Sequence, residues 1–431
     1  MNAQLENISR GALGMLFLIF ICWLLSTDRR AINWKLVLIS VVAMVAFYLG
    51  VTKVFAINAV FDFISRAFVK MIDVEIESTR LLFSNLVEVR PESWGFIFAV
   101  RVLPTIIFFS ALSSILYYTG ILQKIVYVFA LALSKLKISG AESVSTAANI
   151  FMGQTEAPLM IKPYLEKVNR SEMLLIMVGG MANTAGSVLG AYVSFLGGEN
   201  PESKAFFAMH LLTQSILSAP AAIICSKILF PQTLPVSTEV RIPKQKLGDN
   251  FLDALSLGTT DGLKLAVNVA AMLLAFTALV FVLNYILFKI GDWTSLNAVI
   301  AANTPYDKLS FQMILGYIFS PIAWIIGVDS GDMLKVGQLL GEKTILNEFN
   351  AYLSFGNMKN TGVLTDHKSI LITTYSLAGF ANFASIGIQI GGISQLAPNQ
   401  RKNLTELGVK ALIGGTIACL MCGCIAGALG S

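Results

Sequence analysis

The sequence is poor in charged residues. Only 13% of its 431 residues are Asp, Glu, Lys or Arg, and 55% are hydrophobic, whereas an ordinary soluble domain has about 25% charged residues. Side chains of this composition do not cover the surface of a soluble protein, which excludes a soluble enzyme. The mean hydropathy of +0.71 indicates a membrane protein instead. The net charge of +5 therefore indicates cationic loops beside a bilayer and no binding to nucleic acid.

Cysteines, histidines and enzyme motifs are also scarce. The five cysteines lie in apolar runs, so they do not form the disulfide framework of a secreted protein. Cys419, Cys422 and Cys424 lie among small residues, as is typical of helix packing. The sequence has no Walker loop, HExxH or GxSxG pattern. The chain is therefore not expected to be an enzyme or to use ATP.

Long uncharged runs predict an all-α polytopic membrane protein with eight transmembrane helices, because a bilayer core of about 30 Å needs about 20 helical residues. The runs are residues 11–27, 36–52, 102–123, 173–198, 205–226, 265–288, 369–400 and 411–431. Lys and Arg gather after the first, third, fifth and seventh run, so both termini are predicted to lie outside. Residues 54–92 mix apolar and charged positions, which predicts helices in the membrane interface.

Two further stretches, residues 138–167 and 329–359, are apolar but interrupted by charges. Irregular backbone at membrane depth is tolerated only where it is buried in protein or lines a cavity, so both are predicted to be re-entrant helical hairpins. Each contains an intramembrane acid, Glu156 or Glu348. An ionised carboxylate in the membrane is costly and normally has a partner and a function.

An internal repeat follows these two stretches. The pattern G-x-A-N-x-A-[GS] occurs at residues 180–186 and again at 379–385, each within a long apolar run. Two units of hairpin and helices predict an inverted repeat, the design of secondary transporters whose site lies near the midplane of the membrane.

The second copy of the pattern suggests a binding site. Asn382 and Ser385 are spaced i, i+3 and are expected to share one helix face. Together with Glu348 they suit a ligand with vicinal hydroxyls, because a carboxylate accepts hydrogen bonds and an amide both donates and accepts them. Phe380 and Val188 offer an apolar face for a planar ring.

The chain divides into five predicted parts. They are a scaffold part (1–123), a first transport repeat (124–226), a cytoplasmic linker (227–264), a single scaffold span (265–309) and a second transport repeat (310–431).

Several segments resemble the concentrative nucleoside transporters, specifically the bacterial eight-helix members. They are G-Q-T-E-A-P-L at 153–159, N-E-F at 347–349 followed by A-Y at 351–352, G-F-A-N at 379–382 and R-V-L-P-T at 101–105. The likeness extends from about residue 10 to the end. It implies a homotrimer whose transport domain carries both hairpins and moves against a scaffold as an elevator.

The resemblance also implies roles for individual residues. The residues expected to read the nucleobase are Gln154, Thr155 and Glu156; those expected to contact the ribose are Glu348, Asn382 and Ser385; Val188 and Phe380 line the apolar part. The implied sodium site consists of Asn149, the carbonyl of Met152, Asn183 and the carbonyl of Thr184. Asn183 and Thr184 depart from the family pattern, in which serine and an aliphatic residue are common at these positions. An asparagine oxygen still suits a hard cation, which prefers oxygen ligands.

The sequence therefore predicts a symporter of the bacterial inner membrane that couples sodium entry to the uptake of nucleosides such as uridine. A proton-coupled transporter, with Glu156 or Glu348 titrating, is the near alternative. A passive solute channel is a more distant one, since two re-entrant hairpins also occur in channels. A membrane enzyme acting on nucleotides is disfavoured, because no metal-ligand cluster accompanies the two acids.

Overall fold

The computed structural model describes residues 2–88, 96–242 and 248–430, and over these residues the chain is helical without a strand. The first part contains α1 (Asn2–Leu24), α2 (Trp34–Lys53), α3 (Phe55–Phe83), η1 (Ser84–Val87), α4 (Phe98–Arg101), α5 (Leu103–Tyr118) and α6 (Ile121–Ser134). Next come α7 (Gly140–Asn149), η2 (Ala157–Ile161), α8 (Lys162–Leu165), α9 (Arg170–Ala182), α10 (Gly186–Gly197) and α11 (Pro201–Leu229). The second half contains α12 (Phe251–Trp293), α13 (Leu296–Asn303), α14 (Phe311–Ile325), α15 (Met333–Ile345), α16 (Glu348–Asn360), α17 (His367–Leu377), α18 (Phe383–Leu396), η3 (Pro398–Gln400) and α19 (Arg401–Leu429).

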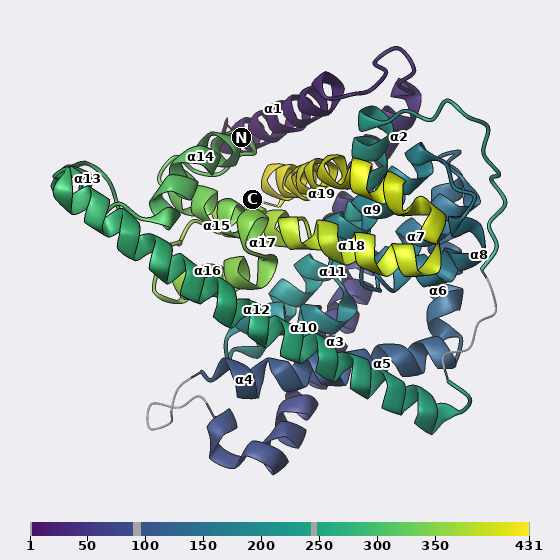
Figure 1. Cartoon of the computed structure of the whole chain (residues 1–431), viewed down its shortest axis with the longest axis horizontal. Helices are drawn as coiled ribbons and strands as arrows, with labels where there is room; N and C mark the ends of the chain where they lie inside the picture. Colours follow the sequence, from purple (N-terminus) through teal and green to yellow (C-terminus); the bar gives the residue numbers. More distant parts are fainter. Residues whose placement is uncertain (1, 89–95, 243–247, 431) are drawn as a thin grey trace.

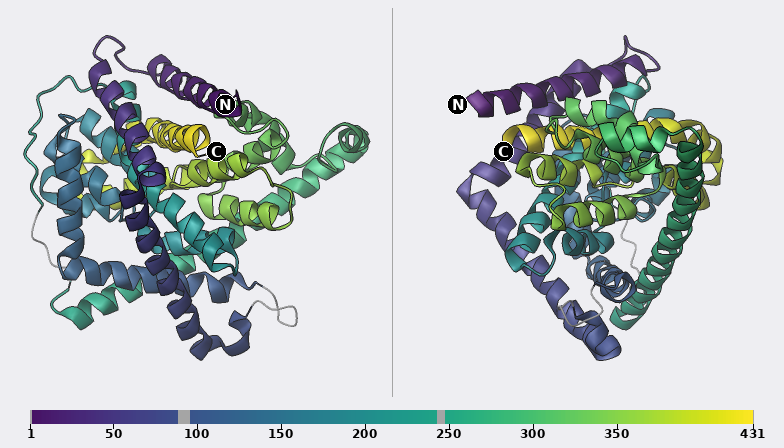
Figure 2. Two further views of the ribbon diagram at one scale, coloured as in Figure 1. Left: turned by 180° about the vertical axis from the view of Figure 1, so that it is seen from behind. Right: turned by 90° about the vertical axis from the view of Figure 1, so that its left-hand side faces the viewer.

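Helices α7 to α11 and α15 to α19 form the core of the molecule (Figure 1). The long helix α12 crosses one side of this core and packs along α5, and α3 lies on the opposite side (Figure 2). Of the most apolar 18 residues of segment 170–197, 94% are buried, whereas of the most apolar 18 residues of α12 only 17% are buried. Helix α12 therefore presents most of its apolar surface to the surroundings.

Seven helical segments of the described residues are long and apolar enough to cross a membrane. They are residues 4–24, 34–53, 98–118, 170–197, 201–229, 251–293 and 398–429. The predicted run 369–400 is not among them, because it is divided into α17 and α18. The predicted linker 227–264 contains the end of α11 and the first 14 residues of α12, and its residues 243–247 lie outside the described part of the chain.

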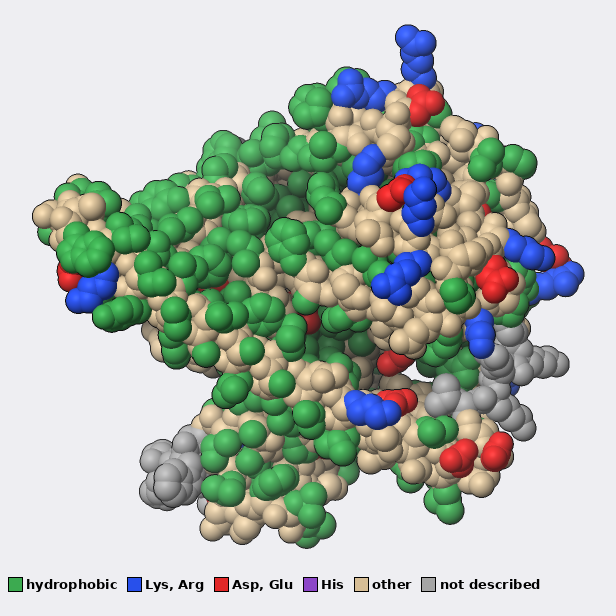
Figure 3. Space-filling view, viewed as in Figure 1, with side chains coloured by type: hydrophobic (Ala, Val, Ile, Leu, Met, Phe, Trp, Pro, Cys, Tyr) green, Lys and Arg blue, Asp and Glu red, His purple; other side chains and the backbone are tan. Residues whose placement is uncertain are grey.

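The surface agrees with a membrane protein. Hydrophobic side chains cover much of the face over α12 and α14, whereas Lys and Arg gather on the right-hand side of the same view (Figure 3). Large apolar side chains such as Leu274, Phe281 and Tyr285 on α12 are more than 60% exposed. Such an extended exposed apolar face indicates contact with lipid or with another protein.

The two interrupted stretches are both helix–loop–helix units. In the first, α7 ends at Asn149, and Gly153 and Pro158 flank the irregular turn that leads to η2 and α8. In the second, α15 ends at Ile345 and α16 begins directly after its N-cap, Asn347, whose side chain accepts from the backbone of the first turn.

Both copies of the repeated pattern lie where a helix is broken. Residues 183–185 separate α9 from α10, and residues 378–382 separate α17 from α18. Gly379 has a φ of +132°, which only glycine adopts readily. A side chain there would also approach the carbonyl oxygen of Ala182 to 2.8 Å. The break in α17–α18 therefore depends on a glycine at this position.

Candidate functional site

The two broken segments contact each other. The backbone N–H of Phe380 donates to the carbonyl oxygen of Asn183 at 3.3 Å. The side-chain amide of Gln214, on α11, donates to the carbonyls of Ala182 and Ala378 at 3.2 and 2.9 Å. The last carbonyls of a helix lack intrahelical partners. Gln214 satisfies one such carbonyl from each broken helix and so holds the two breaks together.

A cleft of about 280 Å³ lies beside these breaks. Its lining includes all eight residues predicted to bind substrate, namely Gln154, Thr155, Glu156, Val188, Glu348, Phe380, Asn382 and Ser385. These residues come from both helix–loop–helix units and both broken helices. Segments more than 200 residues apart in sequence therefore meet around one space.

Glu348 is the centre of the polar wall formed by the second unit. Its carboxylate accepts a hydrogen bond from the side-chain amide of Asn382 at 2.7 Å and lies 3.5 Å from the hydroxyl of Tyr192. Glu348 is also the first residue of α16, where the helix dipole favours a negative charge. The side chains of Glu348 and Asn382 are 4% and 3% exposed. A buried carboxylate held in this way presents its remaining acceptor capacity to the cleft.

Asn382 and Ser385 meet at the start of a helix and not in a helix interior. Asn382 precedes the helix as the N-cap of α18, and its side-chain oxygen accepts from the backbone N–H of Ser385 at 2.9 Å. The helix is interrupted just before them, at the positive φ of Gly379. Both residues still line the cleft, because a cap and the third helical residue lie close together.

The turn of the first unit supplies a second polar wall. The side-chain amide nitrogen of Gln154 donates to the hydroxyl of Ser385 at 3.1 Å, and Gln389 donates to the oxygen of Gln154 at 3.2 Å. The carboxylate of Glu156 accepts from the backbone N–H of Gly153 at 3.3 Å. These bonds fix the turn and connect it to α18.

Most of the remaining lining is apolar or comes from α12, and Ser187 of α10 and Asn347 before α16 add polar groups. Val188 on α10 and Phe380 in the α17–α18 break form the predicted apolar part. The lining also contains Leu265, Asn268, Val269 and Met272 of α12. A cleft with apolar walls and a few convergent polar groups is the usual form of a small-molecule site.

The four predicted sodium ligands lie where the end of α7 approaches the α9–α10 break. Both side-chain polar atoms of Asn149 and the hydroxyl of Thr184 are buried and lack a hydrogen-bond partner within the described residues. The Asn183 side chain donates to the carbonyl of Ser215 at 3.1 Å, and its oxygen accepts from the backbone N–H of Thr184 at 2.9 Å. Met152 is also buried. Unpaired buried polar atoms require a partner, and a cation would supply one to the oxygens.

Two contacts place these ligands on adjoining segments. The backbone N–H of Gly186 donates to the carbonyl of Phe151 at 3.2 Å, and a Cβ added to Gly179 would lie 3.2 Å from the side-chain nitrogen of Asn149. The available ligands are neutral oxygens. In the described part of the chain no group of three or more His, Cys, Asp or Glu side chains is arranged to hold a metal. The residues therefore fit a monovalent hard cation better than a transition metal.

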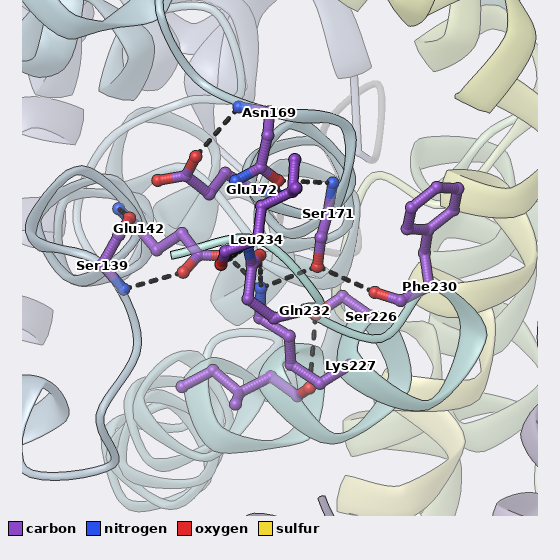
Figure 4. A network of polar contacts seen from close by, with 11 residues as sticks. Ser139, Glu142, Asn169, Ser171, Glu172, Ser226, Lys227, Phe230, Gln232 and Leu234 are labelled. Carbon is purple, nitrogen blue, oxygen red and sulfur yellow. Dashed lines mark hydrogen bonds and ion pairs between the residues drawn. The ribbon is translucent and has the colours of Figure 1, made fainter. Parts of the chain in front are cut away.

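A buried ion pair anchors the other end of α7 (Figure 4). Glu142 pairs with Lys227 of α11, and it also accepts from the backbone N–H of Ser139 at 2.8 Å. Lys227 further donates to the hydroxyl of Ser171, at the start of α9, at 3.0 Å. The ion pair thus ties α7 to α9 and α11. Asn149 lies two turns from Glu142 on the same side of α7.

The sequence analysis missed several residues of this region. They are Gln214, Gln389, Asn268 and Tyr192. The signal for the first three was an amide side chain within a long apolar run, which marks an intramembrane polar residue. That signal does not reveal which cavity or helix break such a residue faces.

Comparison with known proteins agrees with this geometry. Residues 13–86 and 210–427 match the family models described as Na+ dependent nucleoside transporter N-terminus and C-terminus. Residues 99–199 match the model described as nucleoside recognition. An uncharacterized transporter of Haemophilus influenzae is 39% identical, over 98% of this chain and 97% of its own. The rat sodium/nucleoside cotransporter 1 is 38% identical over 77% of this chain, which corresponds to 51% of the longer rat protein.

The fold is likewise similar to a solved transporter. The structure of CNTnw in an inward-facing substrate-bound state has a TM-score of 0.87 and 36% identity, over 98% of this chain and 97% of that one. CNTnw has also been solved in outward-facing and intermediate states, with TM-scores of 0.86 and 0.88. The relatives are transporters and not enzymes, and the family description supports sodium as the coupling ion. The chain is an all-α, multi-pass membrane protein that belongs to the family of concentrative, Na+ dependent nucleoside transporters.

Proposed function

We propose that this protein is a secondary active symporter that couples inward sodium flux to nucleoside uptake by an elevator-type alternating-access mechanism. The observation that carries the proposal is the cleft. Both helix–loop–helix units and both broken helices contribute polar side chains to one space of about 280 Å³. Unpaired buried oxygens lie close to one of the two units.

The polar walls suggest how a nucleoside binds. Glu348, Asn382 and Ser385 contact the ribose hydroxyls, because a carboxylate and an amide together match vicinal hydroxyl groups. Gln154, Thr155 and Glu156 read the edge of the nucleobase from the turn of the first unit. Val188 and Phe380 pack against the faces of the ring.

Sodium is bound by Asn149, the carbonyl of Met152, Asn183 and the carbonyl of Thr184. These ligands belong to α7, its following turn and the α9–α10 break, and the same turn carries Gln154 to Glu156. An ion that orders this turn lowers the cost of binding the nucleobase there. By thermodynamic reciprocity the nucleoside then tightens sodium binding by the same factor.

In the proposed architecture the protein has eight transmembrane helices, two re-entrant hairpins (α7–α8 and α15–α16), interfacial helices and an inverted repeat. The hairpins move with α9–α11 and α17–α19 against a scaffold that contains α1, α2, α5 and α12. The exposed apolar surface of α12 suits a scaffold within a homotrimer in the bacterial inner membrane. Both termini lie outside.

Uptake of labelled uridine into proteoliposomes tests the proposal. Accumulation above the external concentration only with an inward sodium gradient is the expected result. Accumulation with a pH gradient alone would instead favour the proton-coupled alternative, in which a cleft carboxylate titrates. Mere equilibration under every gradient would favour a passive channel, since a channel cannot concentrate a neutral solute.

A further inference from the structure

Asn268 is an isolated polar residue in the long apolar helix α12. Between Lys264 and Thr277 it is the sole residue whose side chain has groups that can donate or accept a hydrogen bond. A polar side chain at membrane depth is costly unless it faces a partner or a wet cavity, so it is a functional candidate by default.

The packing of α12 fixes the direction of Asn268. Gly258 and Gly262 contact α5 so closely that an added Cβ would lie 2.4 Å from the Cβ of Ser114 and 2.8 Å from the Cα of Ile107. With this face against α5, a neighbouring face of α12 lines the cleft through Leu265, Asn268, Val269 and Met272. Asn268 thus faces the same space as Glu348 and Asn382.

No hydrogen-bond partner for the Asn268 side chain occurs in residues 4–88, 96–242 and 248–430, and the side chain is exposed. Its neighbours in the lining on α12 are apolar. The amide has two donors and an acceptor free. These groups suit the base edge or the hydroxyls of a nucleoside in the cleft.

We propose that Asn268 is a substrate-contacting residue contributed by the scaffold, which binds the nucleoside in one access state only. This rests on the proposed elevator function, in which the helices carrying Gln154, Glu348 and Asn382 move together. Helix α12 packs mainly along α5 and makes only a minor contact with α16. The contact from Asn268 is therefore made on one side of the membrane and lost when the transport part moves.

Measuring transport kinetics separately from each side of the membrane tests this inference. Uridine KM is measured for Asn268→Ala in right-side-out and in inside-out membrane vesicles. The loss of one hydrogen bond predicts that KM rises about threefold to tenfold on one side and stays within about twofold of wild type on the other. Thr277→Val removes a polar group from the same helix outside the cleft lining and is expected to leave both KM values unchanged.

Equal changes of KM on both sides, or no change on either side, would overturn the proposal. The test also separates this inference from the function on which it rests. If the symporter proposal fails, the wild-type protein itself shows no sodium-driven uptake. If only the inference fails, wild-type uptake is normal and Asn268→Ala does not raise KM on one side of the membrane alone.

Discussion

At the scale of single residues, the pair formed by Glu348 and Asn382 has the clearest expected role. Both are buried, their side chains are hydrogen-bonded at 2.7 Å, and both line the cleft. The amide donor orients the carboxylate and leaves acceptor positions for a ligand. A carboxylate in this position forms charge-assisted hydrogen bonds to hydroxyl groups, which are stronger than bonds between neutral groups.

Glu348→Gln is expected to raise the uridine KM about tenfold to a hundredfold, because a hydrogen bond to a charged group contributes about 1.5–3 kcal/mol. The measurement is initial uptake in proteoliposomes over a range of uridine concentrations. Glu342→Gln is a matched control, since Glu342 is buried in the same unit but does not line the cleft. Wild-type kinetics in a folded Glu348→Gln protein would remove this residue from the site.

The residues of the cleft were partly predictable from the sequence. All eight predicted substrate residues line one cleft. They could be named beforehand because the chain resembles a known family in the surrounding segments. Gln214 and Gln389 were not predicted, since their partners are backbone and side-chain groups more than 30 residues away. The cap role of Asn382 was also missed, because i, i+3 spacing alone does not distinguish a helix interior from a helix start.

At the scale of elements, the breaks in α9–α10 and α17–α18 determine the site. A continuous helix bonds its carbonyls internally, whereas each break frees backbone groups and lets side chains converge. The pattern G-x-A-N-x-A-[GS] marked both breaks in the sequence. The apolar character of these runs nevertheless predicted continuous spans, because hydropathy does not report a positive φ such as that of Gly379.

Asn149→Ala is expected to raise the sodium concentration for half-maximal uptake at least tenfold, because it removes a proposed ligand from the end of α7. The uridine KM at saturating sodium should change much less. Both quantities come from uptake measured over a range of sodium concentrations. Ser143→Ala is the control, because it also removes an unpaired buried oxygen from α7, at a distance from the α9–α10 break. An unchanged sodium response in Asn149→Ala would place the ion elsewhere.

The ion pair of Lys227 and Glu142 has a testable role in stability. Removing one partner of a buried ion pair costs about 3–5 kcal/mol, because the other charge stays buried without compensation. Lys227→Met is therefore expected to lower the Tm of the detergent-solubilised protein. The double variant Lys227→Met/Glu142→Gln should recover part of this loss, since it leaves no unpaired charge. A single variant as stable as wild type would show that the pair does not anchor α7.

At the scale of the whole molecule, composition and hydropathy predicted the all-α membrane class, which the family matches and the fold similarity confirm. The number of membrane-spanning helices was harder to predict from the sequence. Among the described residues seven segments satisfy length and hydropathy, because run 369–400 is divided in two. Helix α12 also extends well beyond the predicted span 265–288. Run lengths alone cannot separate a broken helix that crosses the membrane from two shorter ones.

The central claim is that one cleft binds the nucleoside and that a neighbouring sodium site is coupled to it. Calorimetric titration of the purified protein with uridine, with sodium and with choline in its place, tests this claim most directly. The account predicts that uridine binds at least tenfold more tightly with sodium in the wild-type protein and that Asn149→Ala abolishes the difference. Equal uridine affinity with and without sodium in the wild-type protein would contradict it.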